Sequence, residues 1–246
     1  MEQVLERTEV TPGQLVMPFY IVCDVSLSMS GDMPQLNEAL RGLRDAIVAE
    51  PAVDDVARIG VLTFSDSARV ESPLAQVSEA QLPHLTDRGG TNYGQAFRKL
   101  AETIEADRQR LKQEGYKVYR PCAFFLTDGL PQDGDWFSTF SSTLTLDPNT
   151  DQGMKSYPIF VPFGFREADE NVLSRLAFPP DKSRWFHANT TSAADALGAI
   201  RNIILKTIVT SGQRASSGQA GALAIAAPDA ESGISSGEST FGSEFV

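Results

Sequence analysis

The chain has 246 residues, 41% of them hydrophobic, which is enough to bury the core of one large domain. Its 32 acidic and 21 basic residues give a net charge of −11 at pH 7. Nucleic acids and anionic membranes would be repelled by this charge, so we exclude both as default partners.

The sequence shows no export signal and no membrane-spanning segment. The N-terminal stretch MEQVLERTEV mixes charges of both signs and lacks the apolar centre of a secretory signal. No apolar run approaches the roughly 18 to 20 residues that span a bilayer. Cys23 and Cys122 lie in apolar runs and are expected to be buried thiols. We therefore expect a soluble protein in the reducing cytoplasm.

Apolar runs rich in β-branched and aromatic residues predict four buried strands, at residues 16–23, 58–64, 118–127 and 157–163. The weaker run 184–188 is expected to be a last edge strand. Residues 68–72 follow the second strand after a short polar turn, so they are expected to pair with it as an antiparallel strand.

Helical periodicity separates these strands, at residues 36–47, 97–111, 170–177 and 192–209. The last helix begins with Ser192 and Asp195, a pair that resembles a capping box. Strands that alternate with helices predict parallel pairing with right-handed crossovers. The expected fold is α/β and doubly wound: a mostly parallel central sheet with helices on both faces and one antiparallel edge strand.

Composition divides the chain into three parts. Residues 1–14 are interpreted as an N-terminal extension and residues 15–210 as the globular domain. Residues 211–246 are rich in Ser, Gly and Ala with sparse acidic residues, which predicts a disordered tail. Residues 131–156 form a long connection that is expected to contain a short helix or a binding loop.

Polar side chains with oxygen atoms gather at the ends of the predicted strands. Asp24, Ser26 and Ser28 follow the first strand, Asp128 follows the third, and Thr91 lies just before a helix. In doubly wound sheets the functional crevice lies beyond the carboxyl ends of the strands. Two carboxylates and three hydroxyls converging there would suit one hard cation, Mg²⁺ or Mn²⁺.

The spacing within this set supports a shared site. Asp24, Ser26 and Ser28 are each two residues apart, so an extended loop would point their side chains the same way. Two glycines before Thr91 allow the tight turn that would bring its hydroxyl close. Asp24 and Asp128 would repel each other without a cation between them.

The D-x-S-x-S stretch, the GGT before Asn92 and the strand-final TDG resemble the metal-ion-dependent adhesion site (MIDAS) of von Willebrand factor type A (VWA) domains. The resemblance covers residues 15 to 209. It implies that Ser26, Ser28 and Thr91 bind the metal directly or through water, and that Asp24 and Asp128 act mainly through water. It also implies a vacant coordination position that an Asp or Glu of a protein partner fills, and a binding function without catalysis.

One position departs from the family pattern. Leu27 stands where the family often has Gly, which places an apolar side chain near the mouth of the site for partner contact. The segments YIVCDVSLSMSG, PQLNEALRGL and FFLTDGLP are similar to bacterial tellurite-resistance-type VWA proteins. That resemblance implies a cytosolic stress-response or signalling complex with a protein kinase and a PP2C-type phosphatase as partners.

Three other functions remain open. A Mg²⁺-dependent hydrolase or phosphotransferase would also place acidic residues at these strand ends, although Ser26 stands where a haloacid-dehalogenase-like enzyme needs Asp. An adaptor of a ring-forming ATPase would use the same module. A scaffold whose last helix moves on binding would use residues 192–209. Two residues could also have purely local roles. Thr91 could cap the helix that begins at Asn92, and Asp66 could stabilise its own turn.

Overall fold

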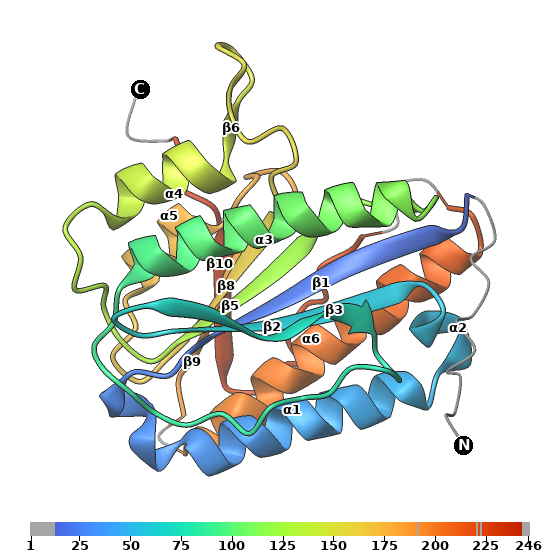
Figure 1. Cartoon of the computed structure of the whole chain (residues 1–246). Helices are drawn as coiled ribbons and strands as arrows, with labels where there is room; N and C mark the ends of the chain where they lie inside the picture. The colour runs from blue at the N-terminus through green and yellow to red at the C-terminus, as the bar shows by residue number, and fades with distance from the viewer. Residues whose placement is uncertain (1–12, 191, 220, 222, 243–246) are drawn as a thin grey trace, which may run out of the picture.

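The computed structural model describes residues 13–190, 192–219, 221 and 223–242. A central sheet is covered by helices on both faces (Figure 1). Its strands are β1 (Leu15–Asp24), β2 (Ala57–Phe64), β3 (Ala68–Gln76), β4 (Lys117–Val118), β5 (Cys122–Thr127), β8 (Ile159–Phe165), β9 (Arg184–Ala188) and β10 (Ile234–Glu238). A separate two-stranded hairpin consists of β6 (Leu146–Asp147) and β7 (Gln152–Gly153).

The helices are α1 (Met33–Val48), α2 (Pro51–Asp54), α3 (Tyr93–Gln113), α4 (Trp136–Leu144), α5 (Glu170–Leu176) and α6 (Ala193–Ser216), with a short 3-10 helix η1 (Leu27–Gly31) after β1. Helix α4 is the short helix predicted within residues 131–156. None of the helices in the described ranges is both long and apolar enough to cross a bilayer.

The strand order is β10-β9-β8-β5-β1-β2-β3, and β4 extends the sheet beside β1. Strand β1 runs parallel to β2 and β5, and β5, β8 and β9 continue in the same direction. Strand β3 is antiparallel to β2, as the sequence predicts. The doubly wound, mostly parallel sheet is confirmed, and both of its edges carry an antiparallel strand because β10 pairs with β9.

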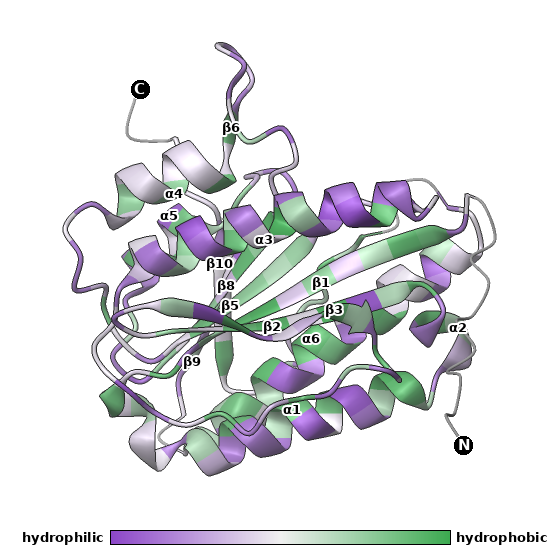
Figure 2. Cartoon of the chain, in the orientation of Figure 1, coloured by the Kyte–Doolittle hydropathy of each residue, from purple (hydrophilic) through white to green (hydrophobic). Residues whose placement is uncertain are grey.

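Strand β1 is buried on both faces, which explains its nearly continuous apolar sequence. Phe19 and Ile21 belong to the core layer under α1 and α6, while Tyr20 and Val22 belong to the layer that includes α3. The helices turn their hydrophobic sides toward the sheet (Figure 2). Burial of each large apolar side chain stabilises the fold by about 1.5–3 kcal/mol.

The segment after residue 210 departs from the predicted disordered tail in its described part. Helix α6 continues to Ser216, and residues 223–242, here called the C-terminal strap, pack against the domain. The Ala224 N–H donates to Ser211 Oγ at 3.1 Å, and the Ala226 N–H donates to Thr207 Oγ1 at 3.0 Å. Buried hydroxyls of α6 therefore hold the first part of the strap.

The strap then reaches the sheet edge and the opposite helical layer. Strand β10 pairs with β9, so residues 184–188 are not the edge of the sheet as predicted. Gly237 lies against Trp185, where an added Cβ would come within 2.5 Å of the indole ring. Phe241 packs against Phe140 and Phe178, at ring-centroid distances of 6.1 and 4.9 Å. These tertiary contacts, and not local composition, order the segment.

Candidate metal centre

The loop after β1 fixes the first carboxylate of the predicted site. Asp24 is the last residue of β1 and is fully buried. Its Oδ1 accepts a hydrogen bond from the Ser26 N–H at 2.9 Å, and its Oδ2 accepts one from Thr127 Oγ1 at 2.8 Å. Both oxygens are thus held by neighbours, one from its own loop and one from the end of β5.

Hydrogen bonds connect four of the five predicted ligands in a continuous chain. Ser26 Oγ lies 3.0 Å from Ser28 Oγ, and Ser28 Oγ donates to Asp128 Oδ1 at 2.9 Å. Together with the bond from the Ser26 N–H to Asp24, these contacts join the loops that follow β1 and β5. The structure therefore brings Asp24, Ser26, Ser28 and Asp128 together at the carboxyl ends of the strands.

Thr91 reaches the same edge through its loop. The Leu27 N–H donates to the Gly89 carbonyl at 3.1 Å, which ties the loop before α3 to η1. Thr91 is buried, and its carbonyl accepts from the Gln132 N–H at 2.9 Å. Within the described residues, the Thr91 hydroxyl makes no hydrogen bond to the other four predicted ligands.

The two glycines before Thr91 are required by close backbone packing. Gly89 has φ +61°, and a Cβ there would come within 2.2 Å of Asp66 Oδ2. Asp66 Oδ1 accepts a hydrogen bond from the Gly90 N–H at 2.9 Å. Asp66 therefore does more than serve its own turn, because its carboxylate anchors the loop that carries Thr91.

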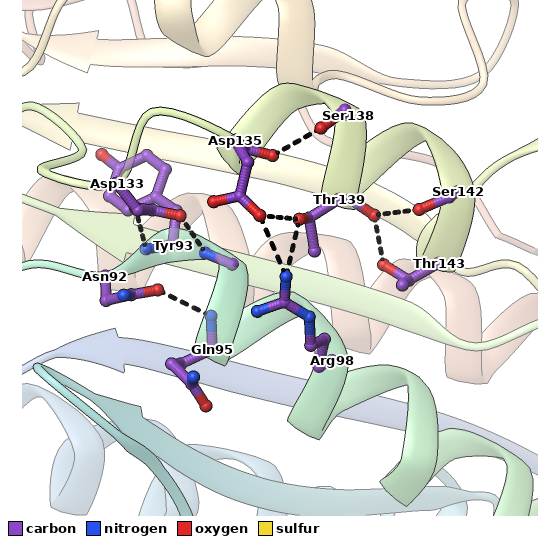
Figure 3. Close-up of polar contacts among 11 residues, drawn as sticks. Asn92, Tyr93, Gln95, Arg98, Asp133, Asp135, Ser138, Thr139, Ser142 and Thr143 are labelled. Atoms are coloured by element: carbon purple, nitrogen blue, oxygen red, sulfur yellow. Dashed lines mark hydrogen bonds and ion pairs between the residues drawn. The ribbon is translucent and has the colours of Figure 1, made fainter.

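Two side chains cap the beginning of α3 (Figure 3). The Asn92 side chain accepts from the Gln95 N–H at 2.9 Å, so Asn92, and not Thr91, is the N-cap. Asp133 accepts from the N–H groups of Tyr93 and Gly94 at 2.9 and 2.8 Å. A carboxylate is favoured here because the helix N-terminus is partially positive. Its contacts fix the loop after β5 against the loop that holds Thr91.

A second contact in Figure 3 ties the loop after β5 to α3. Arg98 Nη2 donates to Asp135 Oδ2 and to Thr139 Oγ1, each at 3.1 Å. Helix α4 is thereby attached to α3 beside the site.

Tyr93 supports the site from inside the core. Its hydroxyl donates to the Gly129 carbonyl at 2.8 Å and lies 3.0 Å from Thr127 Oγ1, the group that donates to Asp24. The ring packs against Phe64 and Phe125. Sequence reasoning missed Tyr93 and Thr127 as supporting residues, although Thr127 stands in the quoted TDG motif.

Burial disfavours the ionised forms of the Asp24 and Asp128 carboxylates. Burial, opposed by hydrogen bonds from Ser26 and Thr127 and reinforced by the charge of Asp128, raises the pKa of Asp24 to about 6. Burial also raises the pKa of Asp128, and the negative charge of Asp32 adds to this shift. The hydrogen bond from Ser28 and the positive charge of Arg166 partly oppose it. A cation between them would stabilise both ionised forms.

Sequence reasoning missed an ion pair beside the site, between the buried Asp32 carboxylate and the partly exposed Arg166 side chain. Asp32 is 1% exposed, and its Oδ1 accepts from Arg166 Nη2 at 2.6 Å. Among the described residues Asp32 Oδ2 has no hydrogen-bond partner. Arg166 follows β8, and the next N–H, of Glu167, donates to the Asp128 carbonyl at 3.0 Å. The strand-end rule that found Asp24 and Asp128 also applies to Arg166.

The donor set fits a hard divalent cation. It contains two carboxylates and three hydroxyls, all with oxygen as the donor atom, as Mg²⁺ and Mn²⁺ prefer. The candidate set includes hydroxyl groups. In the described part of the chain, no metal site could be built from three or more His, Cys, Asp or Glu side chains alone. Cys23 and Cys122 are buried free thiols, and neither belongs to the candidate set of metal ligands.

Comparison with solved structures shows the same fold in several proteins. Proximal thread matrix protein 1 from the mussel byssus matches with a TM-score of 0.53 and 13% identity, over 80% of this chain and 49% of that one. One structure of the mussel protein has a zinc-occupied MIDAS motif. The pilus adhesin SpaC from Lactobacillus rhamnosus GG matches with a TM-score of 0.58 and 14% identity, over 81% of this chain and 31% of that one.

BatB from Bacteroides thetaiotaomicron matches with a TM-score of 0.50 and 13% identity, over 81% of this chain and 99% of that one. The chain thus spans about half of the mussel protein and less than a third of the adhesin. No match was found among curated proteins. The model of the von Willebrand factor type A domain matches residues 19–202, which is most of the chain. The chain belongs to the von Willebrand factor type A domain family.

Proposed function

We propose that the chain is a non-enzymatic protein-interaction module that depends on one divalent cation. Ser26, Ser28 and Thr91 would hold the cation through their hydroxyl oxygens, while Asp24 and Asp128 would act mainly through water. The observation that carries the proposal is the hydrogen-bonded chain from Asp24 through Ser26 and Ser28 to Asp128. It brings oxygen donors from two strand ends together at one edge of the sheet.

The cation, when bound, supplies a positive centre that attracts a carboxylate of a protein partner. The protein's own residues prepare that centre. Asp24 is held in position by hydrogen bonds from the Ser26 N–H and from Thr127 Oγ1. Ser28 donates to Asp128, which fixes the direction of its hydroxyl. Because these contacts restrict the side chains, binding of the cation would cost little conformational entropy.

The choice of cation and the biological setting are also proposed. Mg²⁺ is favoured over zinc because all five donors are oxygen atoms, although the mussel relative holds zinc in its MIDAS motif. The sequence segments similar to tellurite-resistance-type proteins support a bacterial cytosolic stress-response complex. A protein kinase and a PP2C-type phosphatase would be the partners there, each offering an Asp or Glu.

Calorimetric titration of the full chain with MgCl₂ and MnCl₂ tests the site directly. We expect one ion per chain, and at least tenfold weaker binding, about 1.4 kcal/mol, in Asp24→Ala and Ser26→Ala. Asp87→Ala is the matched control, because Asp87 accepts from Ser30 Oγ on η1 but lies outside the ligand set. No binding in the folded wild-type chain, or equal binding in all variants, would reject the metal site.

Partner binding is tested with beads that carry a Glu-containing peptide and, as control, the same peptide with Gln. Capture of the chain should require both Glu and the divalent cation, and a chelator should release it. Turnover of phosphoesters or nucleotides that disappears in Asp24→Ala would instead support the hydrolase alternative.

A further inference from the structure

Two strongly exposed leucines flank the candidate metal centre. Among the described residues they are the large hydrophobic side chains most exposed to solvent, Leu27 at 63% and Leu130 at 53%. Leu27 lies between Ser26 and Ser28, and Leu130 lies two residues after Asp128. Because Ser28 Oγ bonds to Asp128 Oδ1, the two leucines stand on loops that meet at the site.

The backbone near each leucine is held in place. The Leu27 N–H donates to the Gly89 carbonyl at 3.1 Å. Next to Leu130, the Gly129 carbonyl accepts from Tyr93 Oη at 2.8 Å. Within the same short helix as Leu27, Met29 is 2% exposed and belongs to the core. Helix η1 thus buries one apolar side chain and leaves the other in solvent.

Single exposed apolar residues are common and need no explanation. Here both occupy loops that also carry proposed metal ligands. Ordered apolar side chains around a cation exclude water when a partner binds, which strengthens the electrostatic attraction at the centre. Their placement therefore indicates a contact surface and not incidental exposure.

Charge near the site limits the kind of partner. Asp66 and Asp87 lie on the loops beside Gly90 and Ser30, each within hydrogen-bond distance of that neighbour, and the whole chain carries a net charge of −11. A partner segment with several acidic residues would meet like charges there. A segment with one carboxylate and apolar neighbours would meet less repulsion, because its single charge would lie at the cation.

We propose that Leu27 and Leu130 form an apolar rim that docks a protein segment in which a single Asp or Glu is flanked by aliphatic or aromatic side chains. This rests on the proposed metal-dependent binding and adds the partner's chemistry to it. The carboxylate occupies the cation, and the flanking side chains pack on the rim.

The test is selection from a displayed library of random peptides with one fixed central Glu, in the presence of Mg²⁺. The bait proteins are the wild-type chain, Leu27→Ser, Leu130→Ser and the double variant. Leu146→Ser is the matched control, because Leu146 is a partly exposed leucine in the separate β6–β7 hairpin. Circular dichroism and Mg²⁺ titration are measured for every bait, so folding and metal binding are known independently.

We expect the wild type and Leu146→Ser to enrich aliphatic and aromatic residues within two positions of the Glu. Each rim variant should bind the selected peptides about tenfold more weakly while its Mg²⁺ affinity is unchanged. Metal-dependent binders without apolar enrichment, or enrichment that persists in the double variant, would overturn the proposed rim. Failure of the proposed function gives a different result, because then the wild-type chain would bind no Mg²⁺ in the titration or would select no metal-dependent binder.

Discussion

Ser28 Oγ donates a hydrogen bond to Asp128 Oδ1 at 2.9 Å across a separation of 100 residues. The contact exists because parallel strands β1 and β5 are neighbours and end at the same edge of the sheet. It joins a hydroxyl and a carboxylate that both belong to the proposed ligand set.

The Ser28–Asp128 pair should act as one unit in metal binding. Ser28→Ala and Asp128→Asn are each expected to weaken Mg²⁺ binding at least tenfold, about 1.4 kcal/mol. The double variant should lose less than the sum of the two, because the residues interact directly. Calorimetric titration measures all three affinities.

The matched control for that cycle is Ser30→Ala. Ser30 lies on the same short helix, and its hydroxyl bonds to the Leu27 carbonyl and to Asp87. Its loss should leave Mg²⁺ affinity unchanged. Strict additivity of Ser28→Ala and Asp128→Asn would contradict the coupling.

Thr127 should be a positioning residue that acts through Asp24. Thr127→Val removes the hydroxyl that donates to Asp24 Oδ2 while nearly preserving side-chain volume. An unsatisfied buried acceptor costs about 1–3 kcal/mol, so the unfolding free energy should fall by that amount. Chemical denaturation measures it, and a metal titration should show weaker binding as well.

Tyr93→Phe is the variant with which Thr127→Val is compared. It removes the hydroxyl that donates to the Gly129 carbonyl but leaves the bond from Thr127 to Asp24 in place. Metal affinity should therefore change less than in Thr127→Val. Equal loss in both variants would mean that Thr127 acts only through general stability.

The metal-free protein should become less stable as the pH rises from about 4 to about 6. The pKa of Asp24 is about 6 in the folded chain, against 3.8 ordinarily, so the folded state binds more protons in this window. The unfolding free energy must then fall with rising pH, by at most about 3 kcal/mol for a shift of this size.

Urea denaturation in chelator at several pH values measures this dependence. Asp24→Asn should flatten it, because the amide does not titrate. Saturating Mg²⁺ should stabilise the wild type more at pH 7 than at pH 5, since protons compete with the cation. The prediction would be contradicted if, in chelator, the unfolding free energy of the wild type rose between pH 4 and pH 6 relative to that of Asp24→Asn.

The C-terminal strap should depend on Gly237. Gly237→Val places a side chain where the Trp185 ring lies, within 2.5 Å of the added Cβ. Overpacking of this kind costs about 1–3 kcal/mol, and hydrogen exchange in β9 and β10 should accelerate. Ser236→Val, at an exposed position of the same strand, is the control. Unchanged exchange in Gly237→Val would show that the strap does not depend on this contact.

The fold, and the convergence of four predicted ligands at one edge of the sheet, could be predicted because their signals are local. Buried parallel strands such as β1 and β5 have nearly continuous apolar sequences, and the residues directly after them fall at one edge. Asp24 and Asp128 could be found by that rule alone. Thr91 required the glycines that precede it, which the contact with Asp66 explains.

The supporting contacts were not predictable because they depend on distant partners. Nothing in the sequence around Asp32 indicates that Arg166, 134 residues away, will bond to it. The strap was misjudged for the same reason. Its Ser- and Gly-rich composition is typical of disorder, while its order depends on Thr207 and Ser211 in α6 and on the open edge of β9.

The route of the C-terminal strap bears on where the domain can be cut. The strap leaves α6, lines the outer side of β9 and ends with Phe241 among the aromatic rings near α4. A fragment that stops at residue 202, where the family match ends, would shorten α6 and leave β9 as a bare edge strand, which invites aggregation. The recombinant protein with the best yield should therefore include Phe241, even though the residues proposed to bind the cation all precede residue 129.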